Sequence, residues 1–281
     1  MNAQAAELLA EVEKSPAAVA VHDKAAWMSI FAKYHIVEDP VGSRPHVSGV
    51  YDGASGERGN GPLSRFYDTF IAPNQIAFDI TRDLVCGNHV VRDLTIRLQM
   101  SDKVDAQVPM HLLYELQQQD GEWKIVRLAA HWELLPMIGQ LLGKGWACAG
   151  VLMGLSWRML KLQGLVGMLG FSKAALNIGN AGKRVVEDFA EAFNRKNLAG
   201  VMACFSGDAA SIALPYGETM IEPSHLLDKV NGQLSLSKLL AAGDTISASC
   251  ALKQGETIQE GVVLFEFNRK RRKISRVRFY F

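Results

Sequence analysis

The spacing of apolar and polar residues changes its period along the chain. Residues 1–14 and 16–34 place apolar side chains at helical spacing. Between them stands Ser15-Pro16, a residue pair typical of a helix start, with a capping serine followed by proline in the first turn. We therefore predict two helices at the start of the chain, the second ending near Tyr34.

Strand-like patterns follow. Residues 36–65 are rich in Gly, Pro and Ser, which predicts a strand and then a long loop. Four runs rich in β-branched and aromatic residues begin at Ile76, His89, Val108 and Trp123. Helices followed by consecutive strands predict an α+β domain with a strongly curved antiparallel sheet.

Segment 134–172 is apolar and glycine-rich, and its charged residues are all basic: Lys144, Arg158 and Lys161. Its longest uncharged run, 145–157, is shorter than the about 20 residues that a membrane-spanning helix needs. Two interpretations stay open. One is a helical linker that packs between domains, and the other is an interfacial helix or lid at a membrane surface, with Trp146 and Trp157 at headgroup level.

The first pattern restarts at Gly182, where a helical stretch leads to further strands that end at the last residue, Phe281. We predict an internal duplication, with two tandem α+β domains joined by an apolar helical linker. The predicted boundaries are 1–134 for the first domain, 135–180 for the linker and 181–281 for the second domain.

Composition excludes several classes. The chain has 281 residues, a formal net charge of +1 and 48% hydrophobic residues, as expected for a soluble globular protein that does not bind nucleic acid. Its four cysteines form no metal-binding pair, and no nucleotide, P-loop or metalloprotease motif is present, so we expect no cofactor and no metal. The amino-terminal segment lacks the features of a signal peptide, which favours the cytoplasm, with the membrane surface as a second location.

Three segments resemble a known family. These are FAKYHIVEDPVGSRPHVSG at 31–49, SRFYDTF with its Phe66-Tyr67 pair, and AAHWE with Trp132. Their order and spacing resemble the ketosteroid isomerase-like branch of the NTF2-like superfamily, also described as SnoaL-like or cystatin-like cones, although this chain carries an insertion around GASGERGN. The resemblance implies that helices pack on a curved sheet to enclose a cone in each domain.

The resemblance also implies site residues. The family's general base maps onto Asp39, whose other interpretation is a turn residue before Pro40. The side chains implied to bind substrate are Phe31, Phe66, Tyr67, Leu112, Leu128 and Trp132. The family's two oxyanion donors fall on Ser15 and Leu112, so both are absent in their usual form, and His111, His131 and Tyr67 are candidate replacements. In the second domain the matching positions are apolar: Leu214, Phe189 and Val263.

Three functions remain from the sequence. The first is a cofactor-independent isomerase or lyase, or a dehydratase, that acts on a steroid-like, polyketide-like or other polycyclic lipophile with Asp39 as base. The alternative is a steroid-binding or lipid-binding protein without catalysis, which the missing donors favour. The third is a scaffold that binds only protein partners, which a cone filled by its own side chains would favour.

Partners are predicted at two levels. Besides a small hydrophobic ligand, segments 139–172 and 269–278 are candidates for peripheral membrane contact, although the basic run at 269–273 also fits a solvated hairpin turn. The second domain is interpreted as an intramolecular pseudo-dimer partner of the first, or alternatively as a second hydrophobic binding cone.

Overall fold

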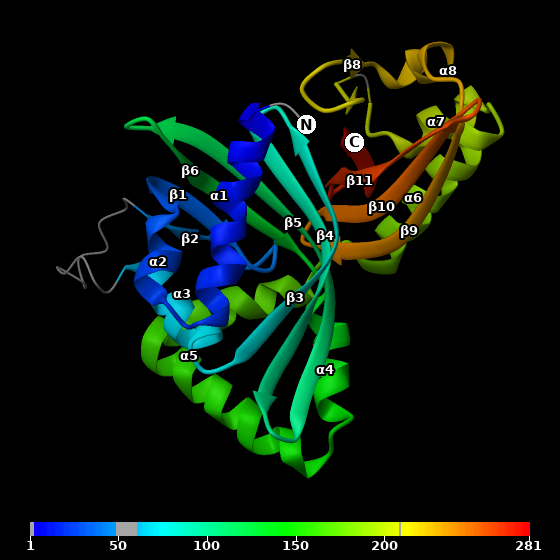
Figure 1. The fold of residues 1–281 in the computed structure, drawn as a ribbon. Helices are drawn as coiled ribbons and strands as arrows, with labels where there is room; N and C mark the ends of the chain where they lie inside the picture. The colour runs from blue at the N-terminus through cyan, green and yellow to red at the C-terminus, as the bar shows by residue number, and fades with distance from the viewer. Residues whose placement is uncertain (1–2, 49–60, 208) are drawn as a thin grey trace. The chain divides into compact units, whose positions relative to one another are not determined.

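The computed structural model describes residues 3–48, 61–207 and 209–281 (Figure 1). The predicted insertion around GASGERGN lies outside the described residues. The chain divides into two compact units, one of residues 1–83 and 88–175 and the other of residues 84–87 and 176–281. Each unit is α+β, as the sequence predicts.

The first unit begins with α1 (Ala3–Ala20) and α2 (Lys24–Ser29). The break predicted at Ser15-Pro16 is wrong, because Pro16 lies inside α1. The helix buries Leu8, Val12 and Val19 along one face, and this packing outweighs the cost of an interior proline. Ser15 is therefore a buried interior residue of the helix rather than its cap.

The predicted helix end at Tyr34 is also wrong, since β1 already begins at Phe31 and runs to Glu38. Residues 31–34 were expected to complete a helical turn. Instead, β1 pairs in parallel with β6, with Val37 opposite Leu128. Pairing and burial in a sheet decide the local structure here over an ambiguous helical spacing.

The first sheet has six strands in the order β2-β1-β6-β5-β4-β3 (Figure 1). The remaining strands are β2 (His46–Val47), β3 (Gln75–Cys86), β4 (His89–Ser101), β5 (Val104–Gln119) and β6 (Glu122–His131). The four predicted strand runs coincide with β3 to β6. Between β2 and β3 lie α3 (Pro62–Phe66) and a π-helical turn (Tyr67–Ile71).

The apolar segment forms α4 (Leu134–Leu142) and α5 (Trp146–Ser172), which belong to the first unit. Gly164 interrupts the helical geometry of α5 with a φ of 69°, a value that suits glycine. The end of α5 packs on the π-helical turn, where the rings of Phe171 and Phe70 stack with centroids 5.2 Å apart. Among the described residues, no helix is both long enough and apolar enough to cross a membrane.

The second unit repeats this topology, with strand order β8-β7-β12-β11-β10-β9. Its helices are α6 (Gly179–Asn194), α7 (Leu198–Cys204) and α8 (Leu226–Lys229), with short 3-10 turns at Lys173–Ala175, just before the unit, and at Pro223–His225. Its strands are β7 (Ser211–Ala213), β8 (Met220–Ile221), β9 (Gln233–Ala242), β10 (Thr245–Gln254), β11 (Thr257–Asn268) and β12 (Lys273–Tyr280). In each unit a cis X-Pro bond follows the first strand of the sheet, at Asp39-Pro40 and Leu214-Pro215. The predicted repeat is thus visible in the shared strand order.

Candidate active site

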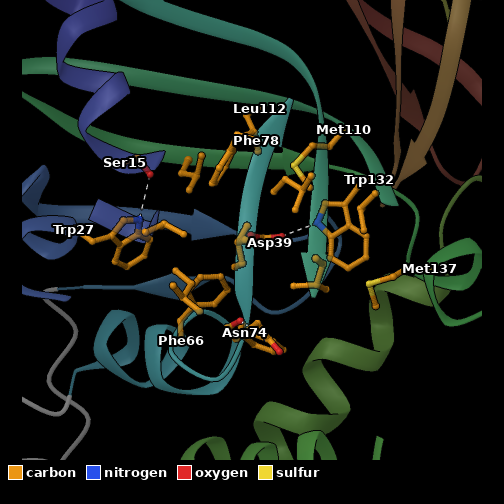
Figure 2. Close-up of a pocket in the computed structure, with 18 of the residues that line it drawn as sticks. Ser15, Trp27, Asp39, Phe66, Asn74, Phe78, Met110, Leu112, Trp132 and Met137 are labelled. Atoms are coloured by element: carbon orange, nitrogen blue, oxygen red, sulfur yellow. Dashed lines mark hydrogen bonds between the residues drawn. The ribbon is translucent and has the colours of Figure 1, made fainter. Parts of the chain in front are cut away.

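An apolar cavity of about 140 Å³ lies inside the first unit (Figure 2). Its walls come from α1, α2, the π-helical turn, strands β3 to β6, and both α4 and α5. The side chains with hydroxyl, carboxyl or amide groups among its described lining residues are Ser15, Asp39, Asn74 and Tyr114. A cavity with few polar groups on apolar walls is the usual form of a small-molecule site.

Strand alternation explains which side chains reach the cavity. On β5, Val108, Met110, Leu112 and Tyr114 all line it, because successive even-numbered residues point to the same face of the sheet. Odd-numbered residues of the same strand point to the opposite face. His111 is therefore directed away from the cavity.

Asp39 borders the cavity just beyond the end of β1. The indole of Trp132 donates a hydrogen bond from Nε1 to Asp39 Oδ1 at 2.6 Å (Figure 2). Burial among apolar walls raises the pKa of Asp39 to about 6, and the Trp132 hydrogen bond partly opposes this rise. Asp39 retains some accessible surface because it borders the cavity. The pKa of this carboxylate therefore lies close to neutral pH.

Tyr114 is a second polar group in the cavity wall, and hydrogen bonds connect it to Ser15 and Trp27. Trp27 Nε1 donates to Ser15 Oγ at 3.1 Å, and the Ser15 hydroxyl is hydrogen-bonded to that of Tyr114 (Figure 2 shows the first of these bonds). Burial raises the pKa of Tyr114 to about 12, while the nearby Arg92 guanidinium acts in the opposite direction. The phenol therefore keeps its proton at neutral pH.

The structure brings five of the expected residues to the cavity: Asp39, Phe66, Leu112, Leu128 and Trp132. Phe31 is buried but packs on Trp27, with ring centroids 4.9 Å apart, and is not one of the described lining residues. Tyr67 likewise packs on Trp27 at 5.5 Å, and its hydroxyl is buried without a hydrogen-bond partner among the described residues. Both rings therefore pack against Trp27, which lines the cavity, and are not among the described lining residues themselves.

The two candidate histidine donors lie elsewhere. His111 and His131 face one another across β5 and β6, and Asp93 on β4 is the next residue of the same row. His111 Nε2 lies 3.6 Å from Asp93 Oδ1, and all three side chains are buried. Since Leu112 points into the cavity, this row belongs to the opposite face of the sheet.

Sequence reasoning missed Tyr114, Trp27 and the role of Ser15. Tyr114 had a detectable signal, because it lies two residues beyond Leu112 and must share its face if that stretch is a strand. The lining residues from the apolar segment, Leu155 and Phe171, had no such signal. Among the described residues, no group of His, Cys, Asp or Glu is arranged to hold a metal ion.

The second unit has almost no room at the corresponding place. Its internal cavity is about 10 Å³, and the side chains around it include Phe189, Leu214 and Phe279. This volume is close to the smallest that accommodates one water molecule. The alternative of a second hydrophobic binding cone is therefore not supported by the space available.

No protein-family model and no curated protein matches this chain. Solved structures do resemble it. A Δ5-3-ketosteroid isomerase from Mycobacterium sp. is 23% identical over 45% of this chain and 92% of its own, with a TM-score of 0.36. A Mycobacterium tuberculosis protein in complex with estradiol-17β-hemisuccinate is 18% identical over 47% and 96%, with a TM-score of 0.38. An LEH-like epoxide hydrolase from M. tuberculosis is 17% identical over 50% and 93%, with a TM-score of 0.38. Each match covers about half of this chain.

Proposed function

We propose that the first unit is a cofactor-independent isomerase or lyase for a steroid-like or other polycyclic lipophile, with Asp39 as the proton-transfer base. The observation that supports this best is the carboxylate itself, which borders an apolar cavity, has a pKa of about 6 and is held by Trp132 at 2.6 Å. A base is most effective when its pKa lies near the working pH.

The proposed step needs no second reactant. The Asp39 carboxylate removes a proton from a carbon next to a carbonyl group, and the electron pair of the broken C–H bond moves into the conjugated system as an enolate. The protonated Asp39 then returns the proton to another carbon, so the double bond moves and the base is regenerated. Apolar walls keep water from competing for the proton.

The size of the cavity limits the ligand. A volume of about 140 Å³ is similar to that of engineered cavities that hold benzene, and below the about 300 Å³ at which drug-sized sites begin. A polycyclic ligand therefore requires lining side chains to move. Met100, Met110 and Met137 line the cavity, and the unbranched thioether side chain adapts readily to a new neighbour.

The alternative is a carrier that binds the same lipophile without converting it. It uses the same cavity and needs neither the proton affinity of Asp39 nor a hydroxyl donor. The scaffold hypothesis is less supported, because the cone of the first unit is not filled by its own side chains.

Turnover of a β,γ-unsaturated 3-ketosteroid separates the enzyme from the carrier. We expect the native protein to form the conjugated enone, followed by ultraviolet absorbance, and Asp39→Asn to lower kcat by about 10²- to 10⁴-fold. Asp79→Asn is the matched control, since Asp79 is half-exposed and paired with Arg97. Binding that Asp39→Asn leaves unchanged, without turnover by the native protein, would favour the carrier.

We also propose that α5 contacts a lipid surface. Its exposed side chains include Trp146 at 94%, Met153 at 70%, Trp157 at 65% and Leu169 at 63% relative exposure, while Leu155 and Phe171 line the cavity. A helix that is apolar all round needs an apolar partner, and the absence of acidic residues in segment 134–172 favours an anionic bilayer. The lipid surface would then supply the ligand.

Segment 269–278 has less support as a lipid contact. The run at 269–272 lies in the turn between β11 and β12. Arg278 pairs with Glu266 at 2.7 Å, and Arg271 and Lys273 donate to backbone carbonyl groups. These contacts within the second unit engage much of its charge.

Vesicle co-sedimentation tests the lipid contact. We expect the native protein to bind phosphatidylcholine vesicles containing phosphatidylserine, and the double variant Trp146→Ser, Trp157→Ser to bind at least about tenfold more weakly. Ile258→Ser, which removes an exposed apolar side chain from β11, is the control. Equal binding by both variants would contradict the proposal, and a native dimer that only the double variant loses would assign α5 to a second copy of the chain.

A further inference from the structure

We infer that Tyr114 donates the hydrogen bond to the substrate's carbonyl oxygen, supported by Ser15 and Trp27. This inference rests on the proposed function of the cavity and concerns the same site. It assigns the donor to Tyr114, two residues beyond Leu112 on β5, whereas the positions expected from the family's pattern carry Ser15 and Leu112. Three observations support this assignment: the position of Tyr114 in the cavity wall, its hydrogen bond with Ser15 and the nearby Arg92.

Tyr114 occupies the cavity wall together with Asp39. It shares a face of β5 with Met110 and Leu112, and both of these also line the cavity. Its side chain is 1% exposed to solvent, so a ligand in the cavity meets the phenol without competition from bulk water. Asp39 and Tyr114 line the same cavity, so one ligand can lie against both groups.

The hydrogen bonds among the described side chains allow Tyr114 to keep its proton for a ligand. An indole N–H can only donate, so Ser15 Oγ must accept from Trp27 Nε1. The Ser15 hydroxyl hydrogen can then be directed to the Tyr114 oxygen, with which it is hydrogen-bonded. Tyr114 accepts from Ser15 in this arrangement, so its own hydrogen can be directed to a ligand in the cavity. Ser15 and Trp27 are thus positioning residues.

A buried cation strengthens this donor. Arg92 is 1% exposed and forms a bidentate pair with Asp83 at 2.7 and 2.9 Å. Its guanidinium favours the anionic form of Tyr114 and so makes the hydroxyl a stronger hydrogen-bond donor, while the carboxylates of Asp39 and Asp83 act in the opposite direction. Burial nevertheless keeps the phenol protonated, which a donor requires.

The donor completes the reaction. When Asp39 removes the proton from carbon, negative charge develops on the carbonyl oxygen. A hydrogen bond from Tyr114 is stronger to that oxygen in the enolate than in the ketone, so it lowers the barrier. No proton leaves Tyr114, and the carbonyl is restored when Asp39 returns its proton.

Binding tests the donor without requiring turnover. We expect the native protein to bind 2-naphthol, which carries an oxygen acceptor, about tenfold more tightly than naphthalene, which has none. Tyr114→Phe should remove this preference and leave naphthalene binding unchanged, and Ser15→Ala should reduce the preference. Tyr34→Phe is the control, because Tyr34 is 62% exposed on β1 and does not line the cavity. A preference that survives in Tyr114→Phe would overturn the inference.

Kinetics separate a wrong donor from a wrong function. If the native protein converts the ketosteroid, Tyr114→Phe should lower kcat by about 10²- to 10³-fold with little change in KM. An unchanged kcat in Tyr114→Phe would overturn the inference while the proposed function stands. The remaining outcome is a native protein without turnover whose preference for 2-naphthol disappears in Tyr114→Phe. That result would support Tyr114 as the donor and contradict the proposed reaction.

Discussion

At the scale of single residues, Asp39 combines two opposing influences. Burial in the cavity wall raises its pKa, and the hydrogen bond from Trp132 lowers it. Their sum leaves the carboxylate mostly ionised at neutral pH, although its surroundings disfavour charge. This arrangement suits the proposed base, and it lowers the stability of the folded state.

That cost gives a first prediction. The pKa of Asp39 rises from 3.8 to about 6 on folding, so the folded state binds the proton more tightly and loses stability as pH rises between these values. At about 1.4 kcal/mol per pH unit, the loss is about 3 kcal/mol above pH 7. We expect Asp39→Asn to be more stable than the native protein at pH 8, by up to this amount, and nearly equal at pH 4. Urea unfolding at both pH values measures it.

A second prediction concerns the pH profile. Since only ionised Asp39 accepts a proton, kcat/KM should rise with pH and level off above about 6. Trp132→Phe removes the hydrogen bond that lowers the pKa of Asp39, so the rise should move to higher pH. The profile of the free enzyme checks this, and an inflection that stays in place in Trp132→Phe would contradict the assigned role of the indole.

At this scale the sequence indicates the proposed base, Asp39, better than the side chains around it. Asp39 and Trp132 follow from the resemblance, and both line the cavity. The resemblance does not indicate Tyr114, because the family's donor positions fall on Ser15 and Leu112 in this chain. Tyr114 lies two residues from Leu112 on the same face of β5. It becomes a candidate donor only when the cavity that both residues line is known.

At the scale of elements, strands were predicted more successfully than helices. Strands β4, β5 and β6 pair along most of their length, and β5 alternates between buried and exposed residues from Val104 to Met110. The local spacing from Phe31 to Tyr34 permits either a helix or a strand, and only pairing with β6 decides between them. Helix α1 continues through Pro16 because its buried face is set by tertiary packing.

Helix α5 gives a third prediction. Leu155 lines the cavity, so Leu155→Ala should enlarge it and relieve the movement that a large ligand requires. We expect a steroid to bind about tenfold more tightly to this variant, with a smaller change for naphthalene, which is a smaller ligand. Leu165→Ala is the control, because Leu165 is 62% exposed on the same helix. Equal steroid affinity in all three proteins would show that α5 does not limit entry; calorimetric titration measures it.

At the scale of the whole molecule, the two units share strand order but differ inside. The first encloses about 140 Å³ and the second about 10 Å³. The sequence indicates the repeat and the apolar character of the second unit. It does not reveal how far side chains fill each cone, because that depends on rotamers and on residues distant in the chain. The prediction that the second unit acts as a pseudo-dimer partner stays a prediction.

This difference gives a fourth prediction, which is one ligand per chain. Leu112→Trp should fill the cavity of the first unit and abolish binding of 2-naphthol and steroid alike, with no residual second site. Circular dichroism should show that the variant is folded. A stoichiometry of two in the native protein, or one remaining site in Leu112→Trp, would locate a binding site outside this cavity.

The filled second unit also offers a starting point for protein engineering. Phe189 lies at the centre of its core, fully buried and in edge contact with Phe205 and Phe265. Truncating such a ring costs about 3–5 kcal/mol and leaves a void. A chain with a natural cavity in the first unit and an engineered cavity in the second would carry two binding sites. Each site could be changed without altering the residues that line the other.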